Sequence, residues 1–148
     1  MIQAKSGSIL YRSSKWKNTI ADSAAYLILA LFMYTAASKL FTLDNFASTL
    51  AKSPLIGSYS KLLAWLIPIS ELLVSLLLII ARTRKQGLYA ALLLMVLFTT
   101  YLCYMVLSGT KLPCSCGGVV SNLSWQQHIW FNIAFIVLAF TGTRMYKN

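Results

Sequence analysis

Long apolar segments constrain this chain more than any other feature of its sequence. Four of them, residues 19–40, 59–80, 86–108 and 125–143, are each long enough to cross about 30 Å of hydrocarbon as a helix. Soluble domains carry about 25% charged residues, whereas only 11% of these 148 residues are charged. We therefore predict an all-α integral membrane protein, a four-helix transmembrane bundle that forms a single domain over residues 1–148 and contacts membrane lipid.

The basic residues flank the predicted spans, so the formal charge of +10 indicates membrane topology rather than a nucleic-acid partner. One side of the membrane receives nine of them: Lys5, Arg12, Lys15, Lys17, Arg82, Arg84, Lys85, Arg144 and Lys147. The other side receives four: Lys39, Lys52, Lys61 and Lys111. Because positive charge accumulates in cytoplasmic loops, we predict that both termini, including the basic segment 1–18, lie in the cytoplasm. The loop between the third and fourth spans then faces the opposite side, which in a bacterial inner membrane is the periplasm.

A short amphipathic segment separates the first two predicted spans. Leu43, Phe46, Ala47 and Leu50 recur at helical spacing and form one apolar stripe, and Thr42 precedes them as a candidate N-cap. We predict a short interfacial helix here. It either lies flat on the outer leaflet or covers a site beneath it.

Two of the three cysteines, Cys114 and Cys116, lie one residue apart in a Pro/Gly-rich segment. Such residues are about 5.5–7 Å apart, at the upper end of the range that a disulfide spans. A ring this small removes little chain entropy, and its strain favours reduction and exchange. The pattern favours redox chemistry or metal capture over a structural clasp.

Cys103 is most simply a small buried apolar residue; its alternative role is an internal shuttle thiol.

Two charged residues occupy apolar surroundings. Glu71 lies deep in the second span, where a carboxyl group is costly and normally faces the bundle interior or a pathway. It is either a protonated group bonded to a neighbouring helix, or a proton relay or quinone-binding group. Lys39 most simply extends to the outer interface, which leaves it too shallow to pair with Glu71 unless the helix tilts. Its alternative role is to bind an anionic or quinone-like group.

Polar residues gather at the head of the fourth span. Ser124 is a candidate N-cap, and Gln127 stands three residues later, as in a capping box. His128 and Asn132 are four residues apart and share a face, and with Trp125 they form a polar-aromatic stripe below the cysteine loop. His128 either accepts a proton from a thiol, bonds a quinone carbonyl, or bonds a backbone carbonyl at the interface.

The chain resembles the MauE/DoxX-like family of redox-associated bacterial membrane proteins, in a variant similar to those of the Bacteroidetes. The resemblance rests on four motifs: Ser38-Lys39-Leu40, Pro68 to Glu71, Pro113-Cys114-Ser115-Cys116-Gly117-Gly118, and Ser124-Trp125-x-x-His128. It implies membrane redox work. MauE is tied to methylamine utilisation and to disulfide formation or maturation of methylamine dehydrogenase, and DoxX-type members are linked to quinone-coupled oxidation. The architecture is also similar to vitamin K epoxide reductase, but with Cys-x-Cys in place of Cys-x-x-Cys and without an obvious second pair.

These observations lead to one main hypothesis and two alternatives. In the main hypothesis, Cys114 and Cys116 exchange electrons with a periplasmic thioredoxin-like partner or client, and His128 assists proton transfer. A quinone cofactor would sit near Glu71, with Lys39, Trp125 and Asn132 as further binding residues. The first alternative is a non-catalytic assembly or maturation subunit of a larger complex. The second is a membrane protein that captures Cu(I) or Zn(II) with Cys114, Cys116 and His128.

Overall fold

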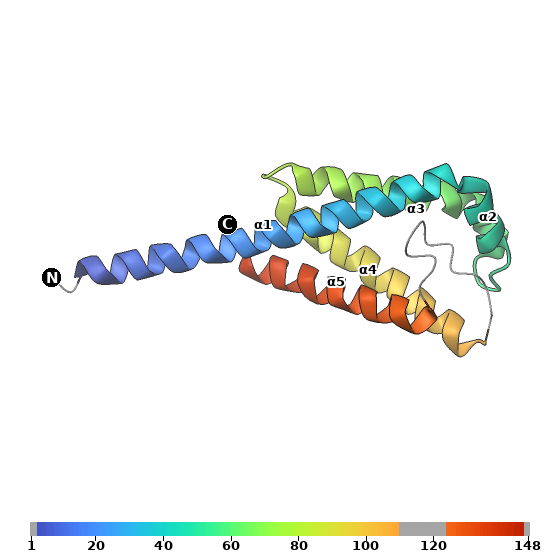
Figure 1. Ribbon diagram of the computed structural model, residues 1–148. Helices are drawn as coiled ribbons and strands as arrows, with labels where there is room; N and C mark the ends of the chain where they lie inside the picture. Colours follow the sequence, from blue (N-terminus) through green and yellow to red (C-terminus); the bar gives the residue numbers. More distant parts are fainter. Residues whose placement is uncertain (1–2, 110–123, 147–148) are drawn as a thin grey trace.

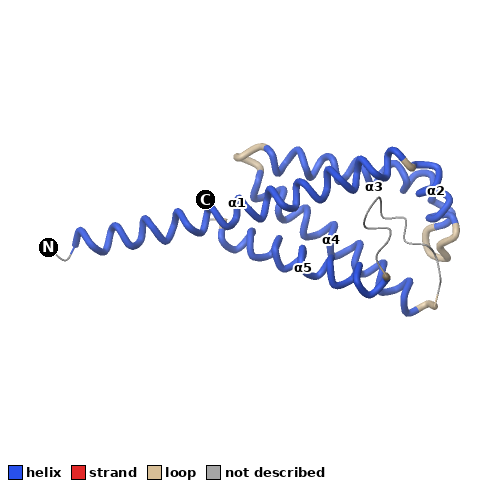
Figure 2. The backbone as a smooth tube through the Cα atoms, viewed as in Figure 1, coloured by secondary structure: helices blue, strands red, loops and turns tan. Residues whose placement is uncertain are grey.

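The computed structural model describes residues 3–109 and 124–146, with side chains from Trp16 onward except that of Trp125. Within these ranges the chain is helical and forms no strand (Figures 1 and 2), which confirms the all-α prediction. The elements are α1 (Gln3–Phe41), α2 (Leu43–Ala51), the 3-10 turn η1 (Gly57–Tyr59), α3 (Ser60–Ile79), α4 (Arg84–Leu107) and α5 (Trp125–Met145).

Three of the described helical stretches are long and apolar enough to cross a membrane: Trp16–Phe41, Gly57–Ile79 and Arg84–Leu107. They match the first three predicted spans and make this a multi-pass membrane protein. The fourth predicted span forms α5, which is not among the three; its first turns carry Gln126, Gln127, His128 and Asn132. The helix that contains the first predicted span is longer than the span itself, because α1 begins at Gln3. No proline interrupts residues 3–41, so the helix continues through the basic segment.

The long helices pack as a closed ring in which α1 and α4 each lie against both α3 and α5. Small side chains on α1, at Ala21, Ala24 and Ala25, are fully buried and let neighbouring helices approach closely. The main apolar core combines residues of all four helices, including Ile28, Leu78, Leu88, Met95 and Ala139. The N-terminal half of α1 extends beyond this ring, at the same end of the molecule as the end of α5 (Figure 1).

The short predicted helix exists as α2, and its apolar stripe packs against the bundle. Phe46 and Leu50 are buried against Ala64 of α3, so α2 covers one end of the ring rather than lying free of it. Thr42 occupies the N-cap position, but its hydroxyl donates to the Ser38 carbonyl (2.8 Å) and does not cap α2. At α5 the predicted capping box is confirmed: Gln127 N donates to Ser124 Oγ and Ser124 N donates to Gln127 Oε1.

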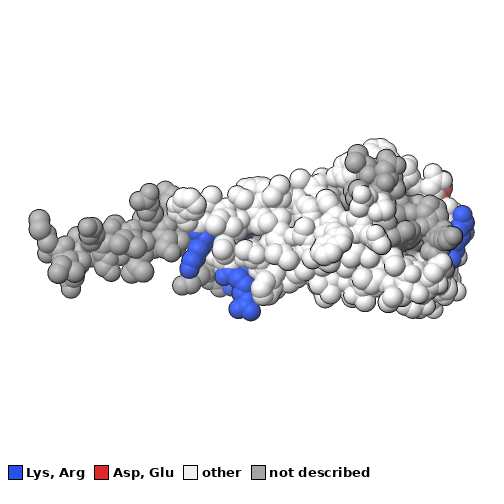
Figure 3. Space-filling model, turned by 60° about the horizontal axis from the view of Figure 1, so that its bottom comes forward, with Lys and Arg blue, Asp and Glu red and all other residues white. Residues whose placement is uncertain are grey.

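The exposed charges are segregated. On the face shown in Figure 3, basic side chains appear near the α1–α5 end and at the α2 end, and the broad surface between them is uncharged. Large apolar side chains cover this part of the molecule, for example Leu73 of α3 and Leu93 of α4, which are 58% and 59% exposed. Such a band in a helical protein faces hydrocarbon, because lipid tails cover apolar side chains without loss.

Candidate functional site

A cavity of about 530 Å³ lies among α1, α3, α4 and α5. Its wall is mostly apolar and aromatic, with Phe32, Ile67, Met95, Phe98, Tyr101 and Phe131 among the lining residues. Six polar or charged side chains also line it: Thr35, Lys39, Ser70, Glu71, His128 and Asn132. An apolar chamber with a few polar groups is the usual form of a small-molecule site.

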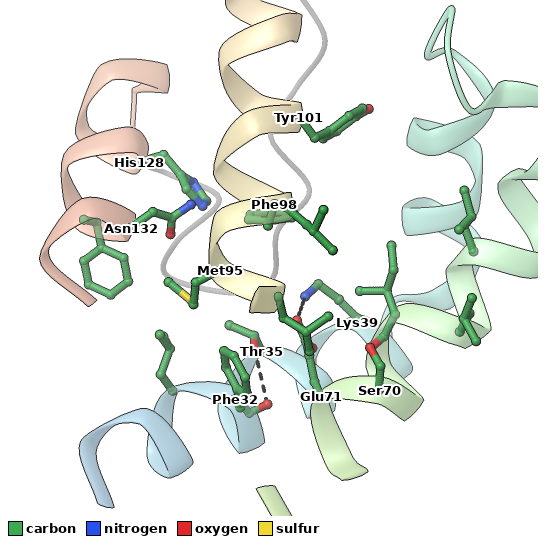
Figure 4. A pocket seen from close by; sticks show the side chains of 17 residues that line it. Phe32, Thr35, Lys39, Ser70, Glu71, Met95, Phe98, Tyr101, His128 and Asn132 are labelled. Carbon is green, nitrogen blue, oxygen red and sulfur yellow. Dashed lines mark hydrogen bonds and ion pairs between the residues drawn. The ribbon is translucent and has the colours of Figure 1, made fainter. Parts of the chain in front are cut away.

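Lys39 and Glu71 form an ion pair on one wall of this cavity. Lys39 Nζ donates to Glu71 Oε1, and the two side chains are only 3% and 12% exposed. Figure 4 shows them pointing toward one another from α1 and α3. The expectation that Lys39 extends to the interface was therefore wrong, as was the expectation that it is too shallow to reach Glu71. The reason is α2, which folds over the end of α1 and encloses the ammonium group.

Two aromatic rings complete the surroundings of Lys39. Its Nζ lies 5.9 Å from the ring centre of Phe46 on α2 and 5.7 Å from that of Phe98 on α4. At these distances the negative faces of the rings attract the cation. The ammonium group is thus held by one carboxylate oxygen and two rings, which offsets part of the cost of removing it from water.

His128 and Asn132 approach the cavity from α5, on the side of Phe98 away from the ion pair (Figure 4). Both are buried, at 2% and 4% exposed, so the predicted shared face points into the bundle. The His128 and Phe98 rings are 6.0 Å apart between centres and tilted by 53°. The capping box at Ser124 fixes the start of α5 and so the height of His128, one turn inside the helix.

Two buried polar atoms in residues that line the cavity have no hydrogen-bond partner among the described residues: Glu71 Oε2 and Asn132 Nδ2. Such atoms are rare in folded proteins, because each one left unpaired costs about 1–3 kcal/mol. They offer opposite chemistry, since a carboxylate oxygen accepts a hydrogen bond and an amide nitrogen donates one. Both residues line the same cavity, so a polar ligand there has an acceptor and a donor available.

The structure brings together four of the predicted site residues: Lys39, Glu71, His128 and Asn132. Cys114, Cys116 and the side chain of Trp125 lie outside the described residues. Cys103 is a free, partly buried thiol on α4 and does not line the cavity. Sequence reasoning missed Phe98 and Tyr101. Met95, Phe98 and Tyr101 follow one another at intervals of three residues and so lie on one face of α4. That helix is apolar on all sides, so the sequence does not show which face turns inward.

The sequence model for the family described as Methylamine utilisation protein MauE matches residues 17–144. The chain belongs to the MauE family. The match includes every residue that lines the cavity, and it also includes Cys114 and Cys116. No curated protein and no solved structure matches the chain. The resemblance to MauE is thus confirmed over nearly the whole chain, and the roles of individual residues in this MauE-family protein have to be argued from its own geometry.

Proposed function

We propose that this MauE-family protein is a thiol–disulfide redox protein of the bacterial inner membrane. Cys114 and Cys116 exchange electrons with a periplasmic thioredoxin-like partner or client, and the bundle holds a quinone as membrane electron carrier. The observation that carries the proposal is the cavity: an apolar, aromatic chamber whose polar groups stand on two walls. A membrane protein with a purely structural role has no need for a chamber of this size containing a buried charge pair.

The exchange chemistry requires a thiolate and a proton acceptor. In the oxidised protein, a client thiolate attacks one sulfur of the Cys114–Cys116 disulfide, and the second client thiol then closes the client disulfide and leaves both cysteines reduced. Reoxidation of the two thiols releases two electrons and two protons. His128, the sole histidine of the chain, stands at the start of α5, the helix that follows the cysteine segment. Its imidazole is the group we assign to receive a proton from a thiol.

The residues present fit a quinone. A quinone bound in the cavity would accept the two electrons and two protons from the thiols. Its ring would pack against Phe98 and Met95, and Asn132 would donate a hydrogen bond to one of its oxygens. The oxygen beside the Lys39–Glu71 pair would gain a partner there when it is reduced to a hydroxyl. The unpartnered Asn132 Nδ2 supports this assignment, since it is a buried donor without an acceptor among the described residues.

We also propose the finer topology: four crossings, with α5 as the fourth, and both ends of the chain in the cytoplasm. Two features support it. The start of α1 and the end of α5 lie at the same end of the molecule (Figure 1), as an even number of crossings requires. That end also carries Lys17, Arg82, Lys85 and Arg144, which agrees with the accumulation of positive charge on the cytoplasmic side.

Thiol trapping in membranes tests the exchange function. Across a glutathione or dithiothreitol series, we expect the Cys114–Cys116 pair to titrate reversibly as a two-electron couple between about −300 and −100 mV, the range of exchanging dithiols. Cys103→Ser is the matched control and leaves the titration unchanged. The methylamine-utilisation description of the family makes an enzyme of that process the first client to assay.

Four other results would contradict the proposal. Thiols that stay reduced throughout, or a bond that never opens, would remove the exchange reaction. If the redox state of the client protein is unchanged after both cysteines are replaced by serine, the result would favour a non-catalytic assembly subunit. Stoichiometric copper or zinc in protein purified without chelator, lost in the same double variant, would favour metal handling.

A further inference from the structure

The two walls of the cavity are not chemically equivalent. On the α1–α3 side, Lys39 contacts Glu71 Oε1 and the rings of Phe46 and Phe98. Among the residues that the structure describes, the unpartnered atom on that wall is Glu71 Oε2, which accepts a hydrogen bond when Glu71 is paired as a carboxylate with Lys39. On the α5 side, the atom without a partner in the same part of the chain is Asn132 Nδ2, a donor.

We infer that the cavity selects the reduced, hydroxyl-bearing form of its ligand, a quinol over the corresponding quinone, and that Glu71 makes the selection. A quinol hydroxyl donates to Glu71 Oε2, and its second hydroxyl oxygen accepts from Asn132 Nδ2. A quinone has only carbonyl acceptors at these positions. It satisfies Asn132 equally well, but it places a carbonyl oxygen against a carboxylate oxygen, which repels it and leaves Glu71 unpartnered.

The unpartnered atoms can reach such a ligand with little rearrangement. Both atoms have almost no accessible surface, so a ligand contacts them after the carboxylate or amide turns about its last side-chain bond. That torsion is broad and soft in both residue types. Lys39 carries three donors, so its pairing with Glu71 survives a partial turn of the carboxylate. Asn132 keeps its place because it is buried, at 4% exposure, on α5.

The inference rests on the proposed function in taking a quinone as the ligand, and its test is independent of thiol exchange. The protein carries Cys103→Ser, Cys114→Ser and Cys116→Ser, so no thiol reacts with the probe. It is reconstituted in lipid nanodiscs without oxygen and titrated calorimetrically with a decyl-substituted p-benzoquinone or its quinol, with empty nanodiscs subtracted for lipid partition. If the thiols titrate and neither ligand binds, this inference is overturned and thiol exchange stands. If the ligands bind with the expected ratio and the thiols do not titrate, thiol exchange is overturned and this inference stands.

We expect the quinol to bind about tenfold more tightly than the quinone, the effect of one hydrogen bond to a charged acceptor. Glu71→Gln, whose amide both donates and accepts, brings the ratio of the two affinities close to one. Asn132→Leu weakens both forms by a similar factor of about five and preserves the ratio. Ser75→Ala is the matched control on the same helix, because its hydroxyl donates to the Glu71 carbonyl (2.8 Å) and does not line the cavity, and it changes neither affinity.

If Glu71→Gln does not fold because Lys39 is left unpaired, the double variant Lys39→Met with Glu71→Gln removes both charges and takes its place; it also brings the ratio close to one. A ratio at or below one in the parent protein, or a ratio unchanged in the Glu71 variants, overturns the inference. If neither form binds, the inference is also overturned, and water is then the partner of the two unpartnered atoms.

Discussion

At the scale of single residues, the Lys39–Glu71 pair is the most demanding feature of the molecule. Two of the three acidic residues of the chain, Asp22 and Glu71, are in ion pairs with buried basic side chains. Away from water, the attraction between the charges is strong but the cost of desolvating them is of similar size. Such a pair therefore adds little net stability, yet it becomes costly when one partner is removed. Its retention inside a cavity fits a role in binding.

Replacing Lys39 tests this argument. Lys39→Met leaves the Glu71 carboxylate buried and unpaired, and we expect it to lower the free energy of unfolding by about 3–5 kcal/mol. The double variant Lys39→Met with Glu71→Gln should lose much less, because no uncompensated charge remains. Unfolding by increasing mole fractions of sodium dodecyl sulfate in mixed micelles provides the measurement. Equal losses in the single and double variants would show that the two side chains do not act as a pair.

At the scale of elements, Arg84 at the start of α4 binds both to α1 and to the end of α3. Its guanidinium donates to Asp22 Oδ1 of α1 (2.7 Å) and to the Leu78 carbonyl of α3 (3.0 Å), and it lies 5.1 Å from the Tyr26 ring centre. Close to it, Gly87 allows α4 to contact α3: a Cβ atom there would lie 3.0 Å from backbone atoms of Leu77 and Leu78. This end of the bundle is therefore held tightly.

Arg84→Lys separates this role from charge alone. Lysine keeps the positive charge but lacks the planar fork that serves several acceptors at once, so we expect a loss of about 1–3 kcal/mol in the free energy of unfolding. Arg82→Lys, at an exposed position two residues earlier, is the control and should change it by less than about 0.5 kcal/mol. The same micelle titration measures both. A loss no larger than that of the control would mean that Arg84 acts only through its charge.

At the scale of the whole molecule, the two ends differ in how they are covered. Basic side chains lie at both ends, but only the end opposite to the α1–α5 end carries α2, which packs on α3 and covers Lys39 through Phe46. The cavity lies among the long helices below α2. In the proposed orientation, α2 and the cysteine segment face the periplasm and the α1–α5 end faces the cytoplasm.

Single cysteines in a chain lacking its own three test this orientation and the fourth crossing. A membrane-impermeant maleimide added to spheroplasts should label Lys52→Cys, next to α2. It should label Arg82→Cys and Arg144→Cys only after the membrane is opened. All three positions are exposed in the structure. Labelling of Arg144→Cys from outside would mean that α5 does not cross, and a reversed pattern for the other two would invert the topology.

The elements that depend on local pattern can be predicted from the sequence alone. Apolar length defined the three spanning helices, the spacing of Phe46 and Leu50 defined α2, and Ser124 with Gln127 defined the start of α5. These features depend on residues a few positions apart, so they can be read along the chain. The shared inward face of His128 and Asn132 belongs to the same class.

The way in which these elements pack together depends on contacts between residues far apart in the chain. Lys39 and Glu71 are 32 residues apart, and Arg84 and Asp22 are 62 apart; no local pattern links them, and a count of apolar residues placed Lys39 at the interface. Their pairing follows from the way α2 closes over α1 and from the packing of α1 against α3. The cavity arises in the same way, because it forms where faces of four helices that are each largely apolar leave space between them.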